Sequence, residues 1–300
     1  MTDTEQPAEP AEAAEAAEAA RLPYTVLSVE RDSHVATLWL DRPEKRNAMG
    51  MPFFAELPEA MAELGRDRDV RAIVISARGP HFSVGLDLTA LADVGGSRNG
   101  GDGSSAPAPS PAEVARRTHA DVLRLQAAIS SAAECPKPVI AAVHGYCIGG
   151  GVDLITSCDI RVCSADAIFS VRETRMAMVA DIGSLARLPL VLPLGQVAEL
   201  VYTGKDIDAE RAEKIGLVNH VFEDAESALA GARALAAEIA ANSPLAVEGA
   251  KAVLSQGYRS QVELAQRFVA AWNAGQLRSH DLTEAVTAFF ERRSPDFQGR

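Results

Sequence analysis

The stretch Ala141–Asp159 reads AAVHGYCIGGGVDLITSCD and joins an apolar run to a pattern typical of a helix. The run Val139–Val143 predicts a buried strand, and Gly149, Gly150 and Gly151 predict a tight turn after it. Glycines lack side chains, so a ligand can approach their backbone closely. The first turn of the following helix has unpaired N–H groups and the positive end of the helix dipole. We therefore expect a site for negative charge, either a phosphate or a thioester oxygen that becomes an enolate.

Asp153 lies just inside the helix that follows these glycines, close to the expected site. Acids are common in the first turn of a helix because they interact favourably with its dipole, so position alone assigns Asp153 no chemistry. A run of glycines is likewise weak evidence by itself. The other motifs of the chain have to decide whether this turn binds a ligand.

The composition limits the classes of protein that the chain can represent. With 300 residues, 47% of them hydrophobic, it can bury one large core or a core and a small second unit. The net charge of −12 argues against nucleic acid as a partner, and no apolar run is long enough for membrane insertion. The four cysteines show no C-x-x-C spacing, which predicts reduced core residues in a cytoplasmic protein.

Two segments have compositions that predict little regular structure. Residues 1–20 are almost wholly Ala, Glu and Pro and lack the apolar segment of a signal peptide, so we expect a disordered acidic tail. Residues 95–111 are rich in Gly, Ser, Pro, Asn and Asp, which predicts a mobile surface loop. We expect this loop to be an insertion without a role, although its place beside a second glycine-containing turn would let it cover the site.

The order of the remaining patterns predicts an α/β fold. Strands are expected at Tyr24–Val29, Val35–Leu40, Val70–Ser76, Val139–Val143, Ile160–Cys163, Ala167–Val171 and Leu217–Phe222. Helices are expected at Met51–Arg66 (kinked or split at Pro58), Glu113–Ala133, Gly183–Leu190, Gly195–Thr203, Ala209–Ile215, Glu226–Ala241, Pro244–Gln256, Ser260–Ala274 and Leu282–Glu291. A strand–strand–helix order recurs within residues 21–220, whereas residues 221–300 are nearly all helical. The second region is expected to cover the core or to bind neighbouring subunits.

Several motifs in this order resemble the signatures of the crotonase superfamily, also called the enoyl-CoA hydratase/isomerase family. They are Leu40–Met49 (LDRPEKRNAM), His81–Leu88 (HFSVGLDL), His144–Asp153 (HGYCIGGGVD) with its extension Ser157–Arg161 (SCDIR), and Phe289–Arg293 (FFERR) near the C-terminus. The resemblance covers about Tyr24 to Phe297. Agreement of this many motifs in the family's order makes chance a poor explanation.

This resemblance implies a spiral of ββα turns and an all-helical C-terminal region used for trimer formation, often with two trimers paired into a hexamer. It implies an acyl thioester of coenzyme A as the ligand and no separate cofactor or metal. The backbone N–H groups of Leu86 and Gly150 would form an oxyanion hole, because two donors stabilise the enolate left when an α-proton departs. The expected contacts to the substrate or its CoA part are Ser83, Val84, Gly85, Asp87 and Gly149.

The acids indicate which members of the family the chain resembles. Asp153 and Glu173 fall where hydratases of the family carry two glutamates, and Asp181 is a third acid. Typical hydratases have a Pro-Gly-x-Gly-Gly stretch in the segment that carries Asp181 here. The run Ala180–Pro189 (ADIGSLARLP), with Glu173 eight places before Asp181, resembles the Δ3,5-Δ2,4-dienoyl-CoA isomerases. In that subgroup the corresponding Asp, Glu and Asp are catalytic.

The reaction expected from this resemblance converts 3,5-dienoyl-CoA to 2,4-dienoyl-CoA in fatty-acid β-oxidation. One group must remove a proton at C2 and another must deliver one at C6, which is too far away for a single carboxylate to serve both. We expect Glu173 near C2, Asp181 near C6 and Asp153 as a neighbour that tunes the pair, with the exchanged assignment of the first two left open. Three carboxyls in one apolar pocket predict that at least one has a raised pKa.

Other interpretations of the acids remain open from the sequence. Glu173 could belong to a surface ion-pair cluster with Arg172 and Arg175, and Asp181 could simply cap the helix that follows it. An enoyl-CoA hydratase would use Asp153 and Glu173 to add water at C3 and would leave Asp181 without a part. A non-catalytic acyl-CoA-binding protein would not need the acids at all.

Overall fold

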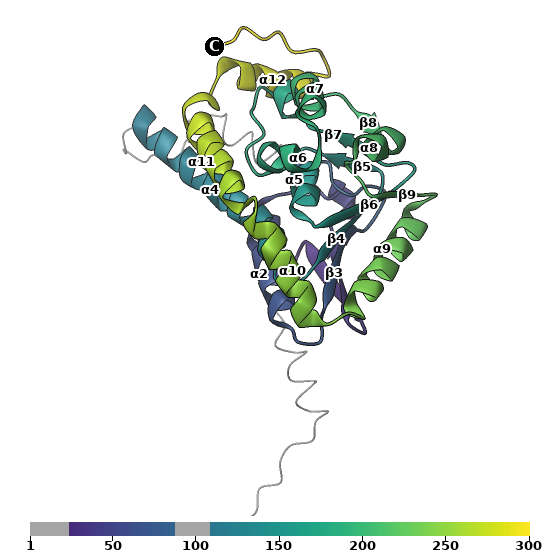
Figure 1. Ribbon diagram of the computed structural model, residues 1–300. Coiled ribbons are helices and arrows are strands. Elements are labelled where there is room, and N and C mark those ends of the chain that lie inside the picture. Colours follow the sequence, from purple (N-terminus) through teal and green to yellow (C-terminus); the bar gives the residue numbers. More distant parts are fainter. Residues whose placement is uncertain (1–23, 88–108) are drawn as a thin grey trace, which may run out of the picture.

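The computed structural model describes residues 24–87 and 109–300, so the predicted acidic tail and most of the predicted loop 95–111 lie outside the described residues (Figure 1). The strands are β1 (Leu27–Asp32), β2 (Val35–Leu40), β3 (Ala72–Ala77), β4 (Val139–Val143), β5 (Tyr146–Ile148), β6 (Ile160–Ser164), β7 (Ile168–Ser170), β8 (Ile207–Asp208) and β9 (His220–Phe222). The helices are η1 (Pro43–Lys45), α2 (Met51–Arg66), α4 (Pro111–Glu134), α5 (Gly150–Ser157), η2 (Glu173–Met176), α6 (Ser184–Val191), α7 (Leu194–Thr203), α8 (Ala209–Ile215), α9 (Ala225–Ala240), α10 (Pro244–Gln256), α11 (Arg259–Gln276) and α12 (His280–Glu291).

Two sheets form the centre of the molecule. The larger sheet has the strand order β1-β2-β3-β4-β6-β9, and the smaller one has the order β5-β7-β8. Within the larger sheet only β1 and β2 are antiparallel, and the strands from β2 to β9 run parallel. Parallel neighbours need a crossover between them, which α2, α4 and α5 supply in turn. The recurring strand–strand–helix order confirms the predicted α/β fold of ββα turns.

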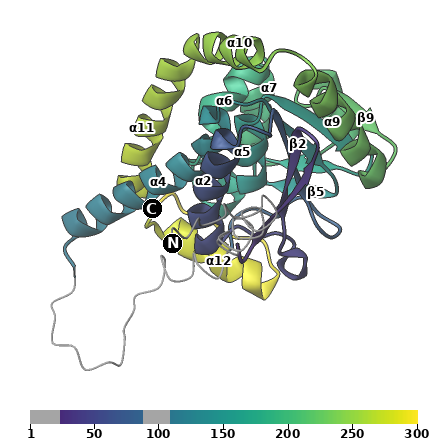
Figure 2. The ribbon, with the colours of Figure 1, turned by 90° about the horizontal axis from the view of Figure 1, so that it is seen from below.

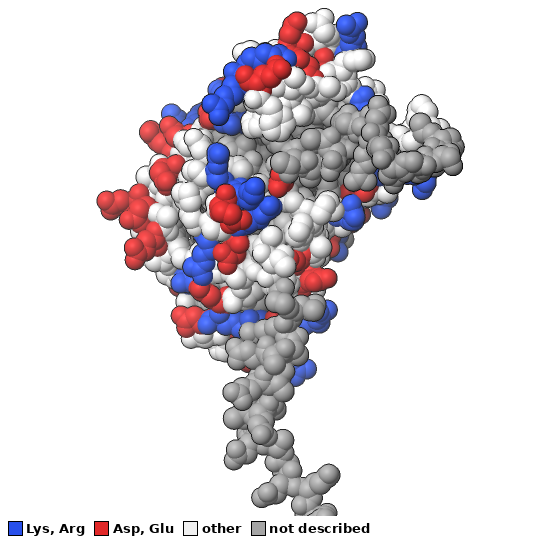
Figure 3. Space-filling view, turned by 180° about the vertical axis from the view of Figure 1, so that it is seen from behind, with Lys and Arg blue, Asp and Glu red and all other residues white. Residues whose placement is uncertain are grey.

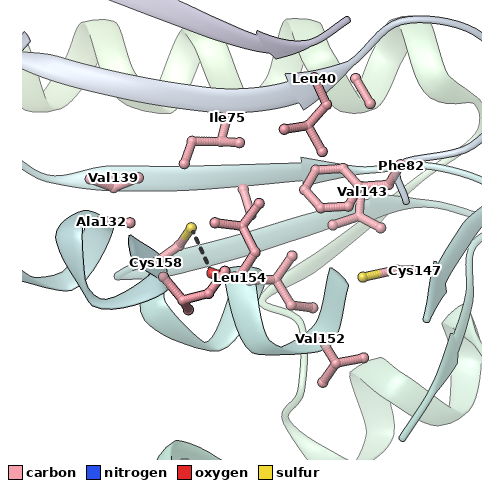
Figure 4. Close-up of a cluster of buried hydrophobic side chains, with 14 of the residues drawn as sticks. Leu40, Ile75, Phe82, Ala132, Val139, Val143, Cys147, Val152, Leu154 and Cys158 are labelled. Carbon is pink, nitrogen blue, oxygen red and sulfur yellow. Dashed lines mark hydrogen bonds between the residues drawn. The ribbon is translucent and has the colours of Figure 1, made fainter. Parts of the chain in front are cut away.

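The core lies on both faces of the larger sheet. Every residue of β3 and β4 is buried, as expected for parallel strands covered on both sides. On one face, Ile75, Val139 and Val143 lie near Leu154 of α5 (Figure 4). α2 is continuous through Pro58, so of the two predicted effects of this proline, a kink or a split, the split does not occur.

The C-terminal helices divide differently from the prediction. α9 packs against β3, β4 and β6, and β9 pairs with β6, so both belong with the larger sheet. The predicted boundary between residues 220 and 221 therefore falls inside β9. The helices beyond are α10, α11 and α12, of which α11 packs against α4 (Figures 1 and 2). Side chains of α4 and α11 both bond to the segment before α6.

The surface and the cysteines complete the description. On the face shown in Figure 3, Lys and Arg side chains are interspersed with Asp and Glu rather than gathered in one basic patch. All four cysteines are buried and unpaired, as predicted. Within residues 24–87 and 109–300, no helix combines the length and the apolar character that crossing a membrane would require.

Candidate active site

The loop that follows β3 is held in place by Asn47, a buried residue of the first sequence motif. Its Nδ2 donates hydrogen bonds to the carbonyls of Arg78 and His81, at 2.9 and 2.8 Å. The Asn47 carbonyl accepts a hydrogen bond from the Ser83 hydroxyl at 2.8 Å, and Ser83 Oγ accepts one from the Gly85 N–H at 3.1 Å. The first and second motifs therefore form one hydrogen-bonded unit that fixes the backbone at Gly85.

Gly85 brings this loop against the glycine turn between β5 and α5. Its φ is +85°, and a Cβ at this position would lie 2.8 Å from the carbonyl oxygen of Ile148 and 3.3 Å from the backbone nitrogen of Gly150. A residue with a side chain could not be accommodated without moving the backbone. The N–H groups of Leu86 and Gly150 lie on either side of this contact, and neither donates a backbone hydrogen bond within the described part of the chain. Both therefore remain available to a ligand.

A cavity of about 740 Å³ opens at this corner. Its lining includes the backbone around both glycine turns, namely Val84, Gly85, Leu86, Asp87, Gly149 and Gly150. Apolar side chains form much of the remainder: Ala48, Ile148, Met176, Met178, Phe289 and Phe290. A mainly apolar cavity with a few convergent polar groups is typical of a small-molecule site.

Glu173, at the start of η2, is the acid of the predicted trio that lines the cavity. Its Oε1 lies 3.0 Å from where a Cβ of Gly149 would be, so the carboxyl group stands beside the glycine turn. Its Oε2 is buried and has no hydrogen-bond partner. The surface ion-pair interpretation does not fit, because Arg172 pairs with Asp206 at 2.6 Å and Arg175 donates to a backbone carbonyl.

Asp153 lies in the first turn of α5 and is almost fully buried. One carboxyl oxygen accepts a hydrogen bond from the backbone N–H of Ser184, at the start of α6. The other, Oδ2, is buried without a hydrogen-bond partner. The buried Arg187 of α6 lies close enough for its charge to favour the ionised form of Asp153, and its Nη2 donates to Ser130 Oγ at 2.9 Å.

Asp181 lies in the segment before α6. Its Oδ2 accepts a hydrogen bond from Nδ2 of Asn273 on α11 at 2.6 Å, and its backbone carbonyl accepts one from Nε2 of Gln126 on α4, also at 2.6 Å. The capping interpretation does not fit, because the N-cap residue of α6 is Gly183 and the first N–H of the helix, that of Ser184, donates to Asp153 instead of Asp181. Asp181 is therefore held by two neighbouring helices rather than by the helix that follows it.

Burial raises the pKa of all three carboxyls, and Glu173 and Asp153 are also affected by neighbouring carboxyls. Burial, together with the charges of the Asp153 and Asp181 carboxyls, raises the pKa of Glu173 to about 8. Burial raises the pKa of Asp153 to about 7, against the opposing hydrogen bond from Ser184. Burial raises the pKa of Asp181 to about 6, against the opposing hydrogen bond from Asn273. Such a cluster retains a proton near neutral pH and can both release and accept one.

The structure places the predicted contact residues unequally. Val84, Gly85, Leu86, Asp87, Gly149 and Gly150 all line the cavity. Ser83 does not, because it is fully buried and its hydroxyl is engaged by Asn47 and Gly85, so its expected substrate contact is corrected to support of the loop. Asp153 and Asp181 are not among the residues that line the cavity. Asp87 also pairs with Arg42, at 3.4 Å.

Three polar residues of the site had no role in the sequence analysis. Asn47 and Arg187 both lie inside quoted motifs, so their position in the motif was an available signal. Asn273 lies 92 residues from Asp181 in the sequence, and no local pattern connects the two. Only the packing of α11 against α4 reveals that contact.

Basic side chains stand at the edge of the cavity. Lys45, Arg46, Arg172 and Arg175 contribute to its lining, together with Glu44. Lys45, Arg46 and Arg175 are exposed, so they can meet a ligand as it enters. Guanidinium and ammonium groups bind phosphate oxygens by charge-assisted hydrogen bonds. The arrangement therefore suits a ligand with phosphates outside and an apolar chain inside.

Comparisons with known proteins agree with this geometry. A sequence model described as enoyl-CoA hydratase/isomerase matches residues 30–106 and 110–300. The peroxisomal Delta(3,5)-Delta(2,4)-dienoyl-CoA isomerase of Arabidopsis thaliana is 41% identical over 277 residues, which cover 91% of this chain and 97% of that protein. The mitochondrial protein of the same name from Homo sapiens is 42% identical over 264 residues, which cover 87% of this chain and 77% of that one.

Solved structures show the same fold. An enoyl-CoA hydratase/isomerase from Pseudoalteromonas atlantica superposes with a TM-score of 0.76 at 28% identity, covering 91% of this chain and all of that one. An enoyl-CoA hydratase from Mycobacterium avium subsp. paratuberculosis superposes with a TM-score of 0.77 at 22% identity, covering 92% of this chain. The second likeness concerns the fold alone, because its sequence identity is low.

Proposed function

Since the chain belongs to the enoyl-CoA hydratase/isomerase family, we propose that it isomerises 3,5-dienoyl-CoA to 2,4-dienoyl-CoA. The observation that carries this proposal is the cluster of Asp153, Glu173 and Asp181, of which Glu173 stands beside the glycine corner. A hydration site needs two acids, whereas a proton shift along a dienoyl chain gives the third acid a part. The names of the relatives from Arabidopsis thaliana and Homo sapiens support the same activity.

In the proposed mechanism the thioester oxygen accepts hydrogen bonds from the N–H groups of Leu86 and Gly150. A carboxylate removes a proton from C2, and the electron pair of that C–H bond enters a conjugated enolate whose charge these donors stabilise. A carboxylic acid then protonates C6, the double bonds move to C2 and C4, and no oxidant or reductant is required. Before the next turnover, a proton passes from the group that gained one to the group that lost one.

The positions of the acids favour Glu173 at C2 and Asp181 at C6. Glu173 stands beside Gly149, next to the corner proposed for the thioester, whereas Asp181 is held by side chains of α4 and α11 and does not line this corner. In the free protein the higher pKa keeps the proton on Glu173, and a base at C2 must be ionised. Forward turnover therefore requires that Glu173 lose its proton and that Asp181 hold one, and Asp153 is the neighbour whose charge affects the pKa of Glu173.

We also propose that the protein assembles through α11. Leu264, Phe268 and Trp272 follow one another at helical spacing on this helix, and all are exposed. Exposed apolar side chains in a row are typical of a protein–protein contact. Trimers, alone or in pairs, are the assembly that the family resemblance implies.

The activity test uses purified protein and 3,5-octadienoyl-CoA, with the absorbance of the conjugated 2,4-dienoyl thioester as the readout. Asp181→Asn is expected to lower the rate about 10²- to 10⁴-fold, the usual contribution of an acid or base. The matched control is Asp121→Asn, on the surface of α4, where the lost pair with Arg124 should have little effect.

Two results would contradict the proposal. Hydration of crotonyl-CoA that is faster than isomerisation and survives Asp181→Asn would identify a hydratase that uses Asp153 and Glu173. Tight binding of acyl-CoA esters with neither reaction would identify a non-catalytic binding protein.

A further inference from the structure

Asn273 connects the C-terminal helices to the acid cluster. It is 2% exposed and lies on the buried face of α11, on the side of the helix away from Phe268. Its Nδ2 donates two hydrogen bonds into the segment before α6, one to the carbonyl of Val179 at 2.9 Å and one to Oδ2 of Asp181 at 2.6 Å. One side-chain amide therefore holds both the backbone and the carboxyl group of this segment.

A second set of buried amides fixes α11 relative to this segment. Gln126 on α4 donates from Nε2 to the backbone carbonyls of Asp181 and Gln266, at 2.6 and 3.0 Å. Gln266 lies on the same buried face of α11 as Asn273. Its own Nε2 donates to Ser130 Oγ at 3.3 Å. These bonds set the position of Asn273, because a buried polar network stabilises one arrangement of its members.

We propose that Asn273 is a positioning residue for the isomerisation: its amide holds the Asp181 carboxyl group and makes it the acid of the cluster that releases its proton most readily. This inference rests on the proposed function for its role in turnover. An ionised carboxylate readily accepts a hydrogen bond from an amide N–H, so this bond favours the ionised form of Asp181. Glu173 has no equivalent donor at its buried Oε2.

The other groups that face Asp181 do not replace this bond. The charged groups of the cluster are Asp153 on α5, Glu173 on η2 and Arg187 on α6. Asp181 raises the pKa of the other two carboxyls, and Arg187 acts on Asp153. From α4 and α11 the facing side chains are neutral amides, of which Gln126 bonds the main chain of Asp181 and Asn273 bonds its carboxyl. Among the described residues, Asn273 is thus the side chain that donates to this carboxylate.

The test compares Asn273→Leu with Gln126→Leu. Both variants remove one buried amide from the same network, but only the first removes the donor to the carboxyl oxygen. Carboxyl pKa values are measured by NMR on protein labelled with ¹³C at aspartate side chains, with the Asp181 signal assigned through Asp181→Asn. We expect Asn273→Leu to raise the Asp181 pKa by about one to two units, as the loss of a hydrogen bond to a charged group implies, and Gln126→Leu to leave it in place.

The pH dependence of kcat gives a second readout. The limb governed by Asp181 should move to higher pH in Asn273→Leu and stay in place in Gln126→Leu. An unchanged Asp181 pKa in a folded Asn273→Leu protein, or the same shift in both variants, would overturn the inference. If the Leu variant does not fold, the smaller Asn273→Ala removes the same donor and is judged by the same criteria.

The two proposals can fail separately. The NMR titration needs no substrate, so an Asp181 pKa that depends on Asn273 would stand even if the wild-type protein did not isomerise dienoyl-CoA. Absence of isomerisation would overturn the proposed function. Isomerisation with an Asp181 pKa indifferent to residue 273 would overturn only the role of Asn273.

Discussion

Glu173 is the residue at which burial and function conflict most directly. Its carboxyl group lies beside a glycine turn, one oxygen lacks a partner, and burial raises its pKa to about 8. The folded protein therefore favours the neutral acid, whereas the unfolded chain ionises at the ordinary value near 4.5. Between about pH 4.5 and pH 8 the unfolded state binds fewer protons, so the stability of the folded state decreases as pH rises.

Glu173→Gln should remove this pH dependence. The amide keeps the shape of the side chain but cannot ionise, so the variant is expected to be more stable than the wild type at about pH 8, by at least about 1 kcal/mol. Near pH 4 the two proteins should have similar free energies of unfolding, because the wild-type carboxyl is then mostly protonated in both the folded and the unfolded state. Urea denaturation across this pH range measures the difference.

A matched control for that experiment is Glu199→Gln. The pKa of this exposed acid is lowered, by its hydrogen bond and charge interaction with Lys205, so neutralising it should bring no gain in stability at alkaline pH. A gain for Glu173→Gln that appeared only at acid pH would show that the native protein holds Glu173 as a carboxylate, contrary to the burial argument.

At the residue scale, the sequence predicted the positions whose chemistry is local. Gly85 and Gly149 could be chosen because glycine motifs mark places where backbone meets ligand, and the acids because they keep motif register. Ser83 was misjudged, since a hydroxyl within a binding motif can serve the loop instead of the ligand. Asn273 could not be predicted, because its partner is brought to it by tertiary packing alone.

At the scale of the elements, two helices carry interior glycines in opposite settings. A Cβ at Gly231 of α9 would lie 2.2 Å from the ring of Phe222, whereas a Cβ at Gly249 of α10 would meet nothing within 4 Å. The first glycine allows α9 to pack closely beside β9, and the second has no packing reason. The pair separates the two effects that replacing glycine has on a helix.

Gly231→Ala is expected to lower the free energy of unfolding by about 1–3 kcal/mol, because the added methyl group forces Phe222 or α9 to move. Gly249→Ala is expected to raise it by about 0.5–1 kcal/mol, because alanine restricts the unfolded chain and favours the helix. Urea denaturation of both variants measures these changes. Equal effects of the two substitutions would mean that the contact with Phe222 adjusts at no cost.

The elements that the sequence could not predict are the short ones. β5 has three residues and β8 has two, so neither shows a hydrophobic period of its own. Both exist because β7 pairs with them, in parallel with β5 and antiparallel with β8. The longer helices were predictable from apolar spacing and start or stop residues, and α8 and α10 have the predicted bounds.

For the whole molecule, the exposed apolar side chains of α11 predict an assembly. Phe268→Glu places a charge in the middle of this row and is expected to shift the protein toward the mass of a single chain, because a buried unpaired charge in an interface is costly. Sedimentation velocity at several protein concentrations measures the shift from three or six chains.

The control for this prediction is Tyr202→Glu, at an exposed aromatic residue of α7, which should leave the mass unchanged. A wild-type protein that sediments as one chain at all concentrations would contradict the assembly proposal. An assembly unaffected by Phe268→Glu would place the contact on another surface.

α11 presents different side chains on its two sides, with Gln266 and Asn273 buried and Leu264, Phe268 and Trp272 exposed. Each side depends on the phase of the same helix, since one added residue turns everything beyond it by about 100°. A single insertion between Gln266 and Asn273 would therefore withdraw the amide from Asp181 and rotate Trp272 out of line with Leu264 at once. Point substitutions can alter either side alone, but the spacing along α11 cannot drift without disturbing both.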